Sequence, residues 1–410
     1  MPAPQHSPRL PHTLRALFRR SLGGTLNAES SPRILILHAT AGSGHRRAAQ
    51  ALEAAFRELE PRAHVRTLDT LHFGSRLFRT GYTPTYDTLV GRVPRVWGLL
   101  YKSLEQPRIH RGTTPLRHAL DRINVRSLVR FIERERPTAV VCTHFLPLEA
   151  LAPRRRRGAL AAPLSCVITD FTAHPFWAIE GIDRSFVATA AVREELASWG
   201  VAWERIAVTG IPIDPRFSQG PLDRTEARTH LQTAPDRPTV LLMGGGNGVG
   251  PLASLAEQLV HLPAAPQLLV VCGRNARLRM RMRAVAESAP GRVRTFGFTD
   301  QIPALLSAAD VIVTKAGGLT CSESLAMGTP MVVFRPTPGQ EERNSTALSV
   351  AGAAIRARTF EQVADGVSRI LAHPALAESM RVACAQLARP RAAAEIVREV
   401  LAMKREPVAA

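Results

Sequence analysis

One histidine stands where a general base is expected. His45 follows Gly42, Ser43 and Gly44 at the predicted start of a helix. The positive end of a helix dipole disfavours an imidazolium, so the ring is expected to be neutral there. A neutral histidine that faces a cleft can take a proton from a hydroxyl group. The alternative is that His45 caps the helix or packs beneath the loop.

A glycine turn and a glutamate form a second candidate site, suited to an anionic ligand. Residues 311–314 form an apolar, β-branched run that predicts a buried strand. Gly317 and Gly318 then let the backbone turn and approach a ligand closely, and a helix is predicted to run from there to Gly328. Helix N-termini of this kind bind anions, and Glu323 is placed to accept hydrogen bonds from ligand hydroxyls. The alternative is an ordinary βα turn with a capping carboxylate.

Both sites stand in a repeated strand–turn–helix pattern. Asp170 ends one of the predicted strands, at the sheet edge where parallel sheets bind ligands. Each half of the chain carries a glycine-rich loop after its first strand, at residues 42–44 and 244–250, although neither loop fits a nucleotide fingerprint. The pattern predicts two parallel-sheet α/β domains in tandem that bind ligands in the cleft between them. The predicted strands are residues 33–38, 65–69, 139–144, 164–170, 184–188, 206–210, 239–243, 267–273, 292–298, 311–314 and 330–334.

Changes in composition along the chain suggest where the domains begin and end. Residues 1–30 carry four arginines and no acidic residue before Glu29, which predicts a basic flexible tail. A polar, proline-containing stretch separates the two strand series. The expected divisions are residues 1–30, 31–215, 216–237 as a linker, 238–385, and 386–410 as a C-terminal helix and tail.

Composition excludes several classes of protein. A hydrophobic content of 45% in 410 residues supports sizeable cores and excludes a disordered chain. No apolar run approaches the roughly 20 residues of a membrane span, and no signal peptide is recognisable. The five cysteines are scattered without CxxC or zinc spacing, which predicts a cytoplasmic protein without a structural metal.

Charge points to an anionic partner. The formal net charge of +19 attracts nucleic acid, anionic lipid or phosphorylated substrates. Part of the excess is also explained if a GC-rich genome uses arginine wherever a cation is tolerated. Residues 72–110 combine arginines with aromatic side chains, a mixture that suits a membrane interface, although a helical subdomain with an aromatic core is the alternative. The aromatic residues that we expect to meet a membrane are Tyr82, Tyr86, Trp97 and Tyr101.

Residues 33–215 and 239–352 together resemble the lipid glycosyltransferases of the monogalactosyldiacylglycerol synthase and processive diacylglycerol glucosyltransferase family. This is glycosyltransferase family 28, which also includes the N-acetylglucosaminyl transferase that forms lipid II. The motifs that carry the resemblance are Gly42-Ser43-Gly44-His45, Thr169-Asp170-Phe171, His174-Pro175, Trp177, Gly210-Ile211-Pro212-Ile213, Gly244-Gly245-Gly246, Gly317-Gly318-Leu319-Thr320, Glu323, Gly328-Thr329-Pro330, Gln340-Glu341 and Asn344.

The resemblance implies a GT-B fold, in which two Rossmann-like domains face a cleft. The N-terminal domain would bind a lipid acceptor at the inner face of the cell membrane, and the C-terminal domain would bind UDP-glucose or UDP-galactose. The implied reaction is inverting transfer of a hexose to a diacylglycerol-type lipid. No Asp-x-Asp motif is present for a divalent ion, so neither a metal nor a cofactor is expected.

The resemblance also implies a role for each motif. Glu323 would hold the ribose, and Phe298 would border the uracil. His45 would be the base, with Asp170 or His174 as its rival. The diphosphate would meet Gly245, Gly246 and the helix start at Gly318, Leu319 and Thr320. Apart from the resemblance, Arg274 or Lys315 is expected to add positive charge near the phosphates. Sugar hydroxyls would meet Gln340, Glu341 and Asn344, while Gly42, Ser43 and Gly44 would lie on the acceptor side.

Three other functions fit parts of the sequence. The same fold could transfer N-acetylglucosamine from its UDP form to a polyprenyl-linked acceptor, although residues 72–110 and the motif from Thr169 to Pro175 favour a diacylglycerol acceptor. A sugar-nucleotide epimerase of the same architecture would need no membrane. Charge alone suggests a nucleic-acid-binding protein, but no recognised motif supports one, and no nucleic-acid partner is expected.

Overall fold

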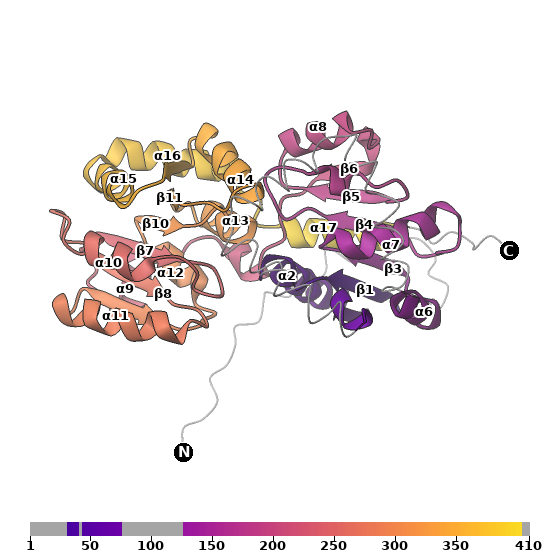
Figure 1. Ribbon diagram of the computed structural model, residues 1–410, viewed down its shortest axis with the longest axis horizontal. Coiled ribbons are helices and arrows are strands. Elements are labelled where there is room, and N and C mark those ends of the chain that lie inside the picture. The colour runs from indigo at the N-terminus through magenta and orange to yellow at the C-terminus, as the bar shows by residue number, and fades with distance from the viewer. Residues whose placement is uncertain (1–30, 41–42, 76–125, 404–410) are drawn as a thin grey trace, which may run out of the picture.

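The computed structural model describes residues 31–40, 43–75 and 126–403. It consists of two α/β domains that lie side by side, each built on a six-stranded sheet (Figure 1). Every strand pair in both sheets is parallel. The predicted pair of parallel-sheet domains is therefore confirmed. Gly42, the predicted basic tail and the aromatic set of residues 72–110 from Arg76 onward lie outside the described residues.

The first domain has the strand order β2-β1-β3-β4-β5-β6. The order reverses direction between β1 and β3, and ligands of open α/β sheets bind at such a switch point. Its strands are β1 (Arg33–His38), β2 (His64–Asp69), β3 (Ala139–Cys142), β4 (Leu164–Val167), β5 (Arg184–Val187) and β6 (Ile206–Val208). Its helices are α2 (Gly44–Leu59), α6 (Arg126–Glu135), α7 (Phe145–Arg156) and α8 (Ala190–Ser198), with the short 3-10 helices η1 (Thr70–Phe73), η2 (Pro175–Trp177) and η3 (Trp203–Arg205).

The second domain has the strand order β12-β11-β10-β7-β8-β9 and reverses direction between β7 and β10. The loops after these two strands are the two glycine turns of the second half, so both lie at the switch point. Its strands are β7 (Thr239–Met243), β8 (Gln267–Val271), β9 (Val293–Phe296), β10 (Val311–Thr314), β11 (Met331–Phe334) and β12 (Ala354–Ala357). Its helices are α9 (Arg224–His230), α10 (Leu252–Leu259), α11 (Ala276–Ser288), α12 (Ile302–Ala308), α13 (Gly318–Ala326), α14 (Gln340–Val350), α15 (Phe360–Ala372) and α16 (Pro374–Leu387).

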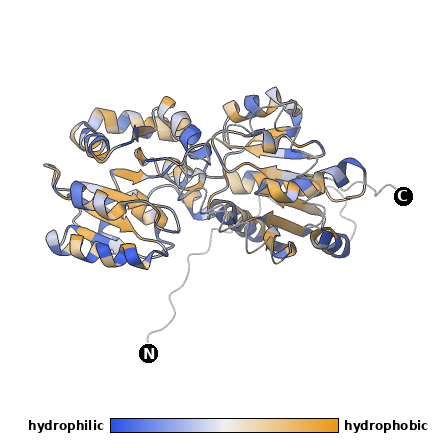
Figure 2. Cartoon of the chain, viewed as in Figure 1, coloured by the Kyte–Doolittle hydropathy of each residue, from blue (hydrophilic) through white to orange (hydrophobic). Residues whose placement is uncertain are grey.

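Hydropathy explains why these segments fold as they do. The strands are apolar and lie inside, while the helices around them turn hydrophilic faces outward (Figure 2). Strands β7, β8 and β10 are buried along their whole length, as expected for parallel strands covered by helices on both faces. None of the described helices is long and apolar enough to cross a membrane.

Two segments outside the predicted domains pack onto them. The final helix, α17 (Ala392–Ala402), returns to the first domain, where Ile396 and Val397 join a core with Phe56 of α2 (Figure 1). Within the predicted linker, η4 (Pro215–Gln219) is followed by α9, whose buried Arg228 donates to Asp310 Oδ2 at 2.7 Å in the second domain. The chain therefore crosses between the domains twice.

The domains meet closely at the first residue of α13. A Cβ atom placed on Gly318 would lie 1.8 Å from the Thr169 carbonyl oxygen, which follows β4 in the first domain. No side chain fits at that distance, so glycine is required here for its size. The close approach brings the start of α13 against the carboxyl edge of the first sheet.

We expect Gly318→Ala to hold the domains apart, because the new methyl group would overlap the Thr169 carbonyl. Small-angle scattering should then report a larger radius of gyration than for the natural protein. Gly317→Ala is the matched control, since a Cβ atom at Gly317 meets nothing within 4 Å. An unchanged scattering profile for Gly318→Ala would contradict the role given to this contact.

Candidate active site

A cavity in the interdomain cleft brings the two glycine-rich loops together. A Cβ atom on Gly246 would lie 3.6 Å from Ser43 Oγ, and one on Gly44 would lie 3.6 Å from a Leu319 methyl carbon. Residues far apart in the sequence thus line one space between the domains. From the predicted set, the lining includes Ser43, Gly44, Gly245, Gly246, Phe298, Leu319, Thr320 and Glu323.

Glu323 presents a buried carboxylate to this cavity. Its side chain is 6% exposed, and no hydrogen bond to that carboxylate is formed within the described part of the chain. Burial, with the nearby Asp214 carboxylate, raises the pKa of Glu323 to about 7, against the charges of Arg47 and Arg216. A carboxylate with both oxygens unused can accept hydrogen bonds from two neighbouring hydroxyl groups.

Three arginines line the same cavity. Arg46 and Arg47 follow His45 in the first turn of α2, while Arg274 lies beyond β8 with its guanidinium 4.1 Å from the Phe298 ring centroid. Among the described residues, none of the three guanidinium groups has a hydrogen-bond partner, and the Nε atom of Arg46 is buried. The cavity therefore holds three cations against one carboxylate and suits an anion of more than one charge.

His45 is held in one tautomer. Its Nδ1 lies 2.6 Å from the Thr143 carbonyl oxygen, which can only accept a hydrogen bond, so Nδ1 carries the proton. The Thr143 hydroxyl donates in return to the His45 carbonyl at 2.9 Å. Burial lowers the pKa of His45 to about 4, which leaves the ring neutral at pH 7. The Nε2 lone pair is therefore available to take a proton.

His144 is a neighbour of His45 that we did not predict as a site residue. Its ring centroid lies 4.6 Å from that of His45, edge to face, and its Nδ1 accepts the Leu146 N–H at 3.1 Å. Burial lowers the pKa of His144 well below its usual value. His144 is the last residue of the predicted strand 139–144, and in the structure it follows β3, next to the switch point between β1 and β3. A polar residue at that end of a predicted strand could have marked it as a site residue.

The rival candidates for the base differ in their hydrogen bonds and in their pKa values. His174 is buried, and its Nδ1 accepts the Phe176 N–H at 3.2 Å to begin η2. Burial raises the pKa of Asp170 to about 6, although a hydrogen bond from Asn344 opposes the shift. The lone pair of His174 Nδ1 is thus used by a backbone N–H, whereas His45 Nε2 carries no proton and accepts no hydrogen bond from any described residue.

The predicted sugar-binding residues begin α14 and lie outside the cavity lining. Glu341 is engaged, with Oε1 2.8 Å from Lys315 Nζ and Oε2 accepting the Thr337 N–H at 2.8 Å. Burial alone would raise the pKa of the Glu341 carboxyl, but Lys315 and Thr337 outweigh it and hold the pKa below its usual range. The side-chain amide of Gln340 forms no hydrogen bond in the described part of the protein.

Asn344, the third of this set, uses both amide hydrogens inside the protein. They go to Asp170 Oδ1 at 2.8 Å and to the Ala316 carbonyl at 3.1 Å. No N–H of this side chain is left to donate to a sugar hydroxyl in this arrangement of the domains.

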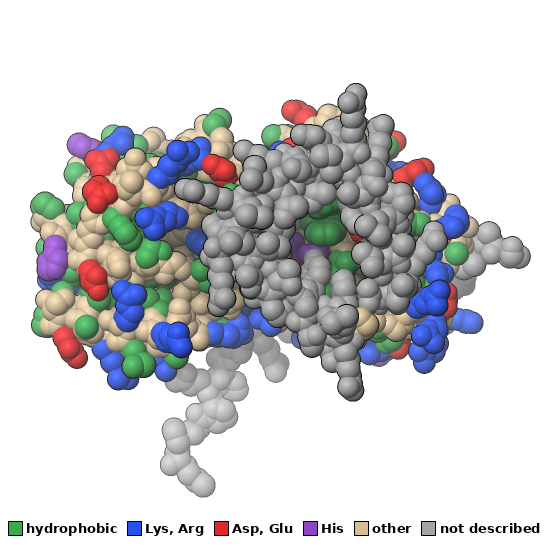
Figure 3. Space-filling view, viewed as in Figure 1, with side chains coloured by type: hydrophobic (Ala, Val, Ile, Leu, Met, Phe, Trp, Pro, Cys, Tyr) green, Lys and Arg blue, Asp and Glu red, His purple; other side chains and the backbone are tan. Residues whose placement is uncertain are grey.

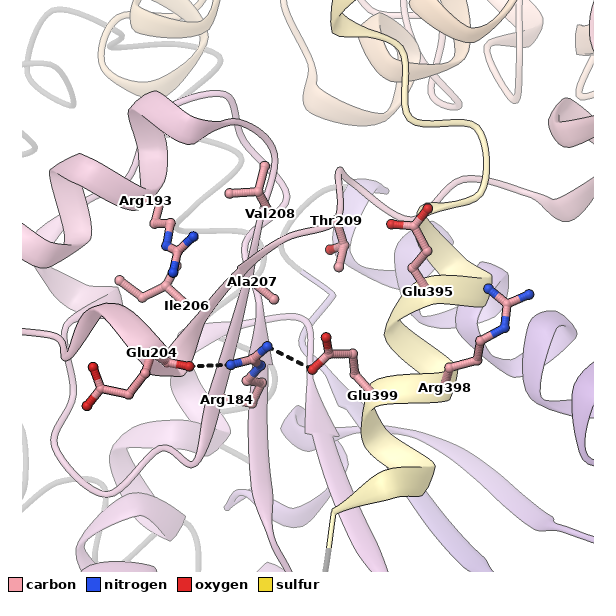
Figure 4. Close-up of a pocket in the computed structure, with 10 residues that line it drawn as sticks. All are labelled: Arg184, Arg193, Glu204, Ile206, Ala207, Val208, Thr209, Glu395, Arg398 and Glu399. Carbon is pink, nitrogen blue, oxygen red and sulfur yellow. Dashed lines mark hydrogen bonds and ion pairs between the residues drawn. The ribbon is translucent and has the colours of Figure 1, made fainter. Parts of the chain in front are cut away.

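A larger cavity lies away from the cleft, beside strand β6 and helix α17 (Figure 4). Its volume of about 520 Å³ exceeds the roughly 80 Å³ of the cleft cavity. Size does not decide function here, because the charged groups of the larger cavity compensate one another. Arg184, for example, donates to the Glu204 carbonyl and forms an ion pair with Glu399 at 2.9 Å. The described residues contain no cluster of three His, Cys, Asp or Glu residues arranged to hold a metal ion.

Two family models match the chain, one in each domain. Residues 45–213 match the model for monogalactosyldiacylglycerol (MGDG) synthase, and residues 239–396 match the glycosyltransferase family 28 C-terminal domain. The chain therefore carries an MGDG synthase domain followed by a glycosyltransferase family 28 C-terminal domain. These two matches confirm the resemblance found in the motifs.

Two relatives carry the name processive diacylglycerol beta-glucosyltransferase. This chain is 33% identical to the protein of that name from Bacillus licheniformis over 246 residues, which make up 60% of this chain and 63% of the relative. The matched region thus spans less than two thirds of that relative. This chain is also 28% identical to the processive diacylglycerol beta-glucosyltransferase of Bacillus cereus strain AH820 over 383 residues, which make up 91% of this chain and 94% of that relative.

Solved structures share the fold at low identity. MurG of Acinetobacter baumannii matches with a TM-score of 0.57 and 17% identity, covering 91% of this chain and 100% of that one. A UDP-GlcNAc 2-epimerase of Neisseria meningitidis matches with a TM-score of 0.55 and 13% identity, covering 90% and 99%. The GT-B fold is thereby confirmed. Since an epimerase shares it, the family models rather than the fold separate these two activities.

The pH dependence of turnover should identify the base. With donor and acceptor both saturating, a neutral His45 remains available until the pH falls through about 4, whereas an ionised Asp170 would be lost as the pH falls through about 6. We expect kcat to stay high at pH 5.5. His45→Gln should lower kcat by roughly 10²- to 10⁴-fold. An acid limb near pH 6, with turnover retained in His45→Gln, would assign the role to Asp170.

Proposed function

We propose that this glycosyltransferase moves glucose from UDP-glucose to diacylglycerol, or to a closely related lipid, with inversion at the anomeric carbon. The observation that carries the proposal is the cleft cavity, whose lining includes one carboxylate and three guanidinium groups that form no hydrogen bond with any described residue. A nucleoside diphosphate sugar matches this pattern, because it presents ribose hydroxyls at one end and a diphosphate near its middle. The names of the relatives support glucose, and UDP-galactose is the alternative donor.

Donor recognition follows from the cavity lining. Glu323 accepts hydrogen bonds from the two ribose hydroxyls. Phe298 is 51% exposed and offers a ring face beside the Arg274 guanidinium, which suits a stacked uracil. Gly245 and Gly246 bring backbone amides to the diphosphate, and Gly246 lies close to Ser43 of the other domain.

Transfer needs negative charge to be stabilised on the departing diphosphate. The acceptor oxygen bonds to the anomeric carbon as the bond from that carbon to the phosphate oxygen breaks, and UDP leaves with the electron pair. The N-terminus of α13 and the guanidinium groups of Arg46 and Arg47 can stabilise this charge. His45 Nε2 takes the proton of the acceptor hydroxyl. A single attack from the opposite side turns an α-linked donor into a β-linked product.

The acceptor is proposed to reach the cleft from the inner surface of the cell membrane. The net charge of +19 supports attraction to anionic lipid. Lys and Arg side chains are spread over the visible face of both domains rather than gathered in one patch (Figure 3). Residues 72–110 and 1–30 remain the proposed contacts.

Product analysis tests the proposed reaction. The protein is incubated with vesicles that contain diacylglycerol and with UDP-glucose, UDP-galactose or UDP-N-acetylglucosamine, and the lipids are identified by mass spectrometry. We expect hexosyl diacylglycerol from UDP-glucose, and none from His45→Gln. Transfer of N-acetylglucosamine to a polyprenyl carrier instead, or lipid-independent conversion of the sugar nucleotide, would contradict the proposal.

Membrane association has its own test. Sedimentation with vesicles rich in phosphatidylglycerol should exceed that with neutral vesicles. Raising the salt from 50 to 500 mM should release most of the protein, since each basic residue near the surface contributes roughly 1 kcal/mol that salt screens. Binding that ignores both lipid charge and salt would show that electrostatic attraction is not what holds the enzyme at a membrane.

A further inference from the structure

Asn344 joins the two domains through its side-chain amide. It lies on α14 in the second domain and is fully buried. Its Oδ1 accepts the backbone N–H of Phe171 at 2.8 Å, and its Nδ2 donates to Asp170 Oδ1 at 2.8 Å, both in the first domain. A third hydrogen bond, to the Ala316 carbonyl at 3.1 Å, anchors the amide beside the start of α13.

Only an amide satisfies all three partners. Two of them are acceptors, the Asp170 carboxylate and the Ala316 carbonyl, and the third is an N–H donor. An aspartate at position 344 could accept from Phe171 but would repel Asp170. An alanine would leave a buried N–H and a buried carboxylate without partners. The free-energy penalty of those unsatisfied groups is larger than the net stabilisation that the original hydrogen bonds gave.

The preceding residue of α14 supports the same connection. Arg343 forms an ion pair with Glu195 of α8, and Glu195 Oε2 accepts the Ala173 N–H at 2.7 Å. Two consecutive residues of one helix thus hold the loop after β4, residues 170–173, from the other domain.

The loop of residues 170–173 directly follows Thr169, which contacts the proposed base His45. Thr169, next to Asp170, places its hydroxyl 3.2 Å from His45 Nδ1. On the other side, Asn344 lies one helical turn after Gln340, at the end of α14 where the donor sugar is expected. One rigid helix therefore spans the distance between the expected sugar and the residues beside the base.

We propose that Asn344 is a positioning residue that couples closure of the donor-binding domain to the placement of Asp170 and the His45 site. Asn344 does not touch the sugar. Its amide completes the acceptor side of the cleft only when the second domain is closed. The inference rests on the proposed transfer reaction for its effect on turnover, but its effect on closure is independent of that reaction.

The test compares Asn344→Asp and Asn344→Ala with Thr346→Ala, an exposed residue of the same helix. For both Asn344 variants we expect UDP-glucose affinity, measured by calorimetry, to stay within about threefold of the natural protein, while kcat falls roughly 10- to 100-fold. Small-angle scattering with UDP-glucose bound should show a more open molecule. Thr346→Ala should match the natural protein in all three measurements.

Other results would overturn the proposal. A loss of UDP-glucose affinity with kcat preserved would make Asn344 a direct sugar ligand, and unchanged closure and turnover would remove its role altogether. Thermal unfolding shows which variants fold. If both Asn344 variants fail to fold, Glu195→Gln, which weakens the second bridge, should still open the UDP-glucose complex, and a closed complex would count against the coupling. If the natural protein transfers no sugar, the proposed function fails, while the scattering measurement still decides the coupling.

Discussion

The close contact between the start of α13 and the end of β4 is the constraint on which the rest of the site depends. Gly318 allows that contact because any side chain would overlap the Thr169 carbonyl. Once the two edges meet, Glu323 on α13 and Arg47 on α2 line the same cavity. Neither domain alone contains both Glu323, the carboxylate that we propose for the ribose, and His45, the histidine that we propose for the acceptor. The proposed active site therefore exists only where the two domains meet.

Burial at this contact then determines the chemistry of the ionisable groups. It keeps His45 neutral and raises the pKa values of Asp170 and Glu323 to about 6 and about 7. Glu341, whose side chain is 13% exposed, stays ionised because Lys315 pairs with it. These side chains lie in similar surroundings but differ in their partners, and the partners decide which groups are free to meet a substrate.

Much of the fold could be predicted from the sequence, because buried parallel strands are continuous apolar runs. All eleven predicted strands are present. Strand β12 was missed because it is short, lies at a sheet edge and contains Arg356, so its pattern does not stand out from the helices around it. The return of α17 to the first domain was not predictable either, since the pattern of an amphipathic helix shows which face is buried but not which surface that face packs against.

The site was predictable to the extent that glycine turns and strand ends mark it. Gly245, Gly246, Glu323 and Phe298 were placed in one cavity as the motifs implied. Arg46 and Arg47 were missed because arginine is common throughout this chain, and only the structure shows which arginines line the cavity. The bridging contacts of Asn344 join residues that are 174 positions apart in the sequence and depend on how the two domains meet, which no local pattern predicts.

The central claim is that the interdomain cavity binds a UDP-sugar through Glu323. Calorimetric titration of UDP-glucose into the natural protein and into Glu323→Gln, at pH 6 and pH 8, tests it most directly. Because the pKa of Glu323 is raised to about 7, its carboxylate is formed at pH 8 and largely lost at pH 6. The account predicts tighter binding at pH 8 for the natural protein, and binding by Glu323→Gln that is roughly tenfold weaker at pH 8 and nearly independent of pH. Equal affinities and equal pH dependence for the two proteins would contradict it.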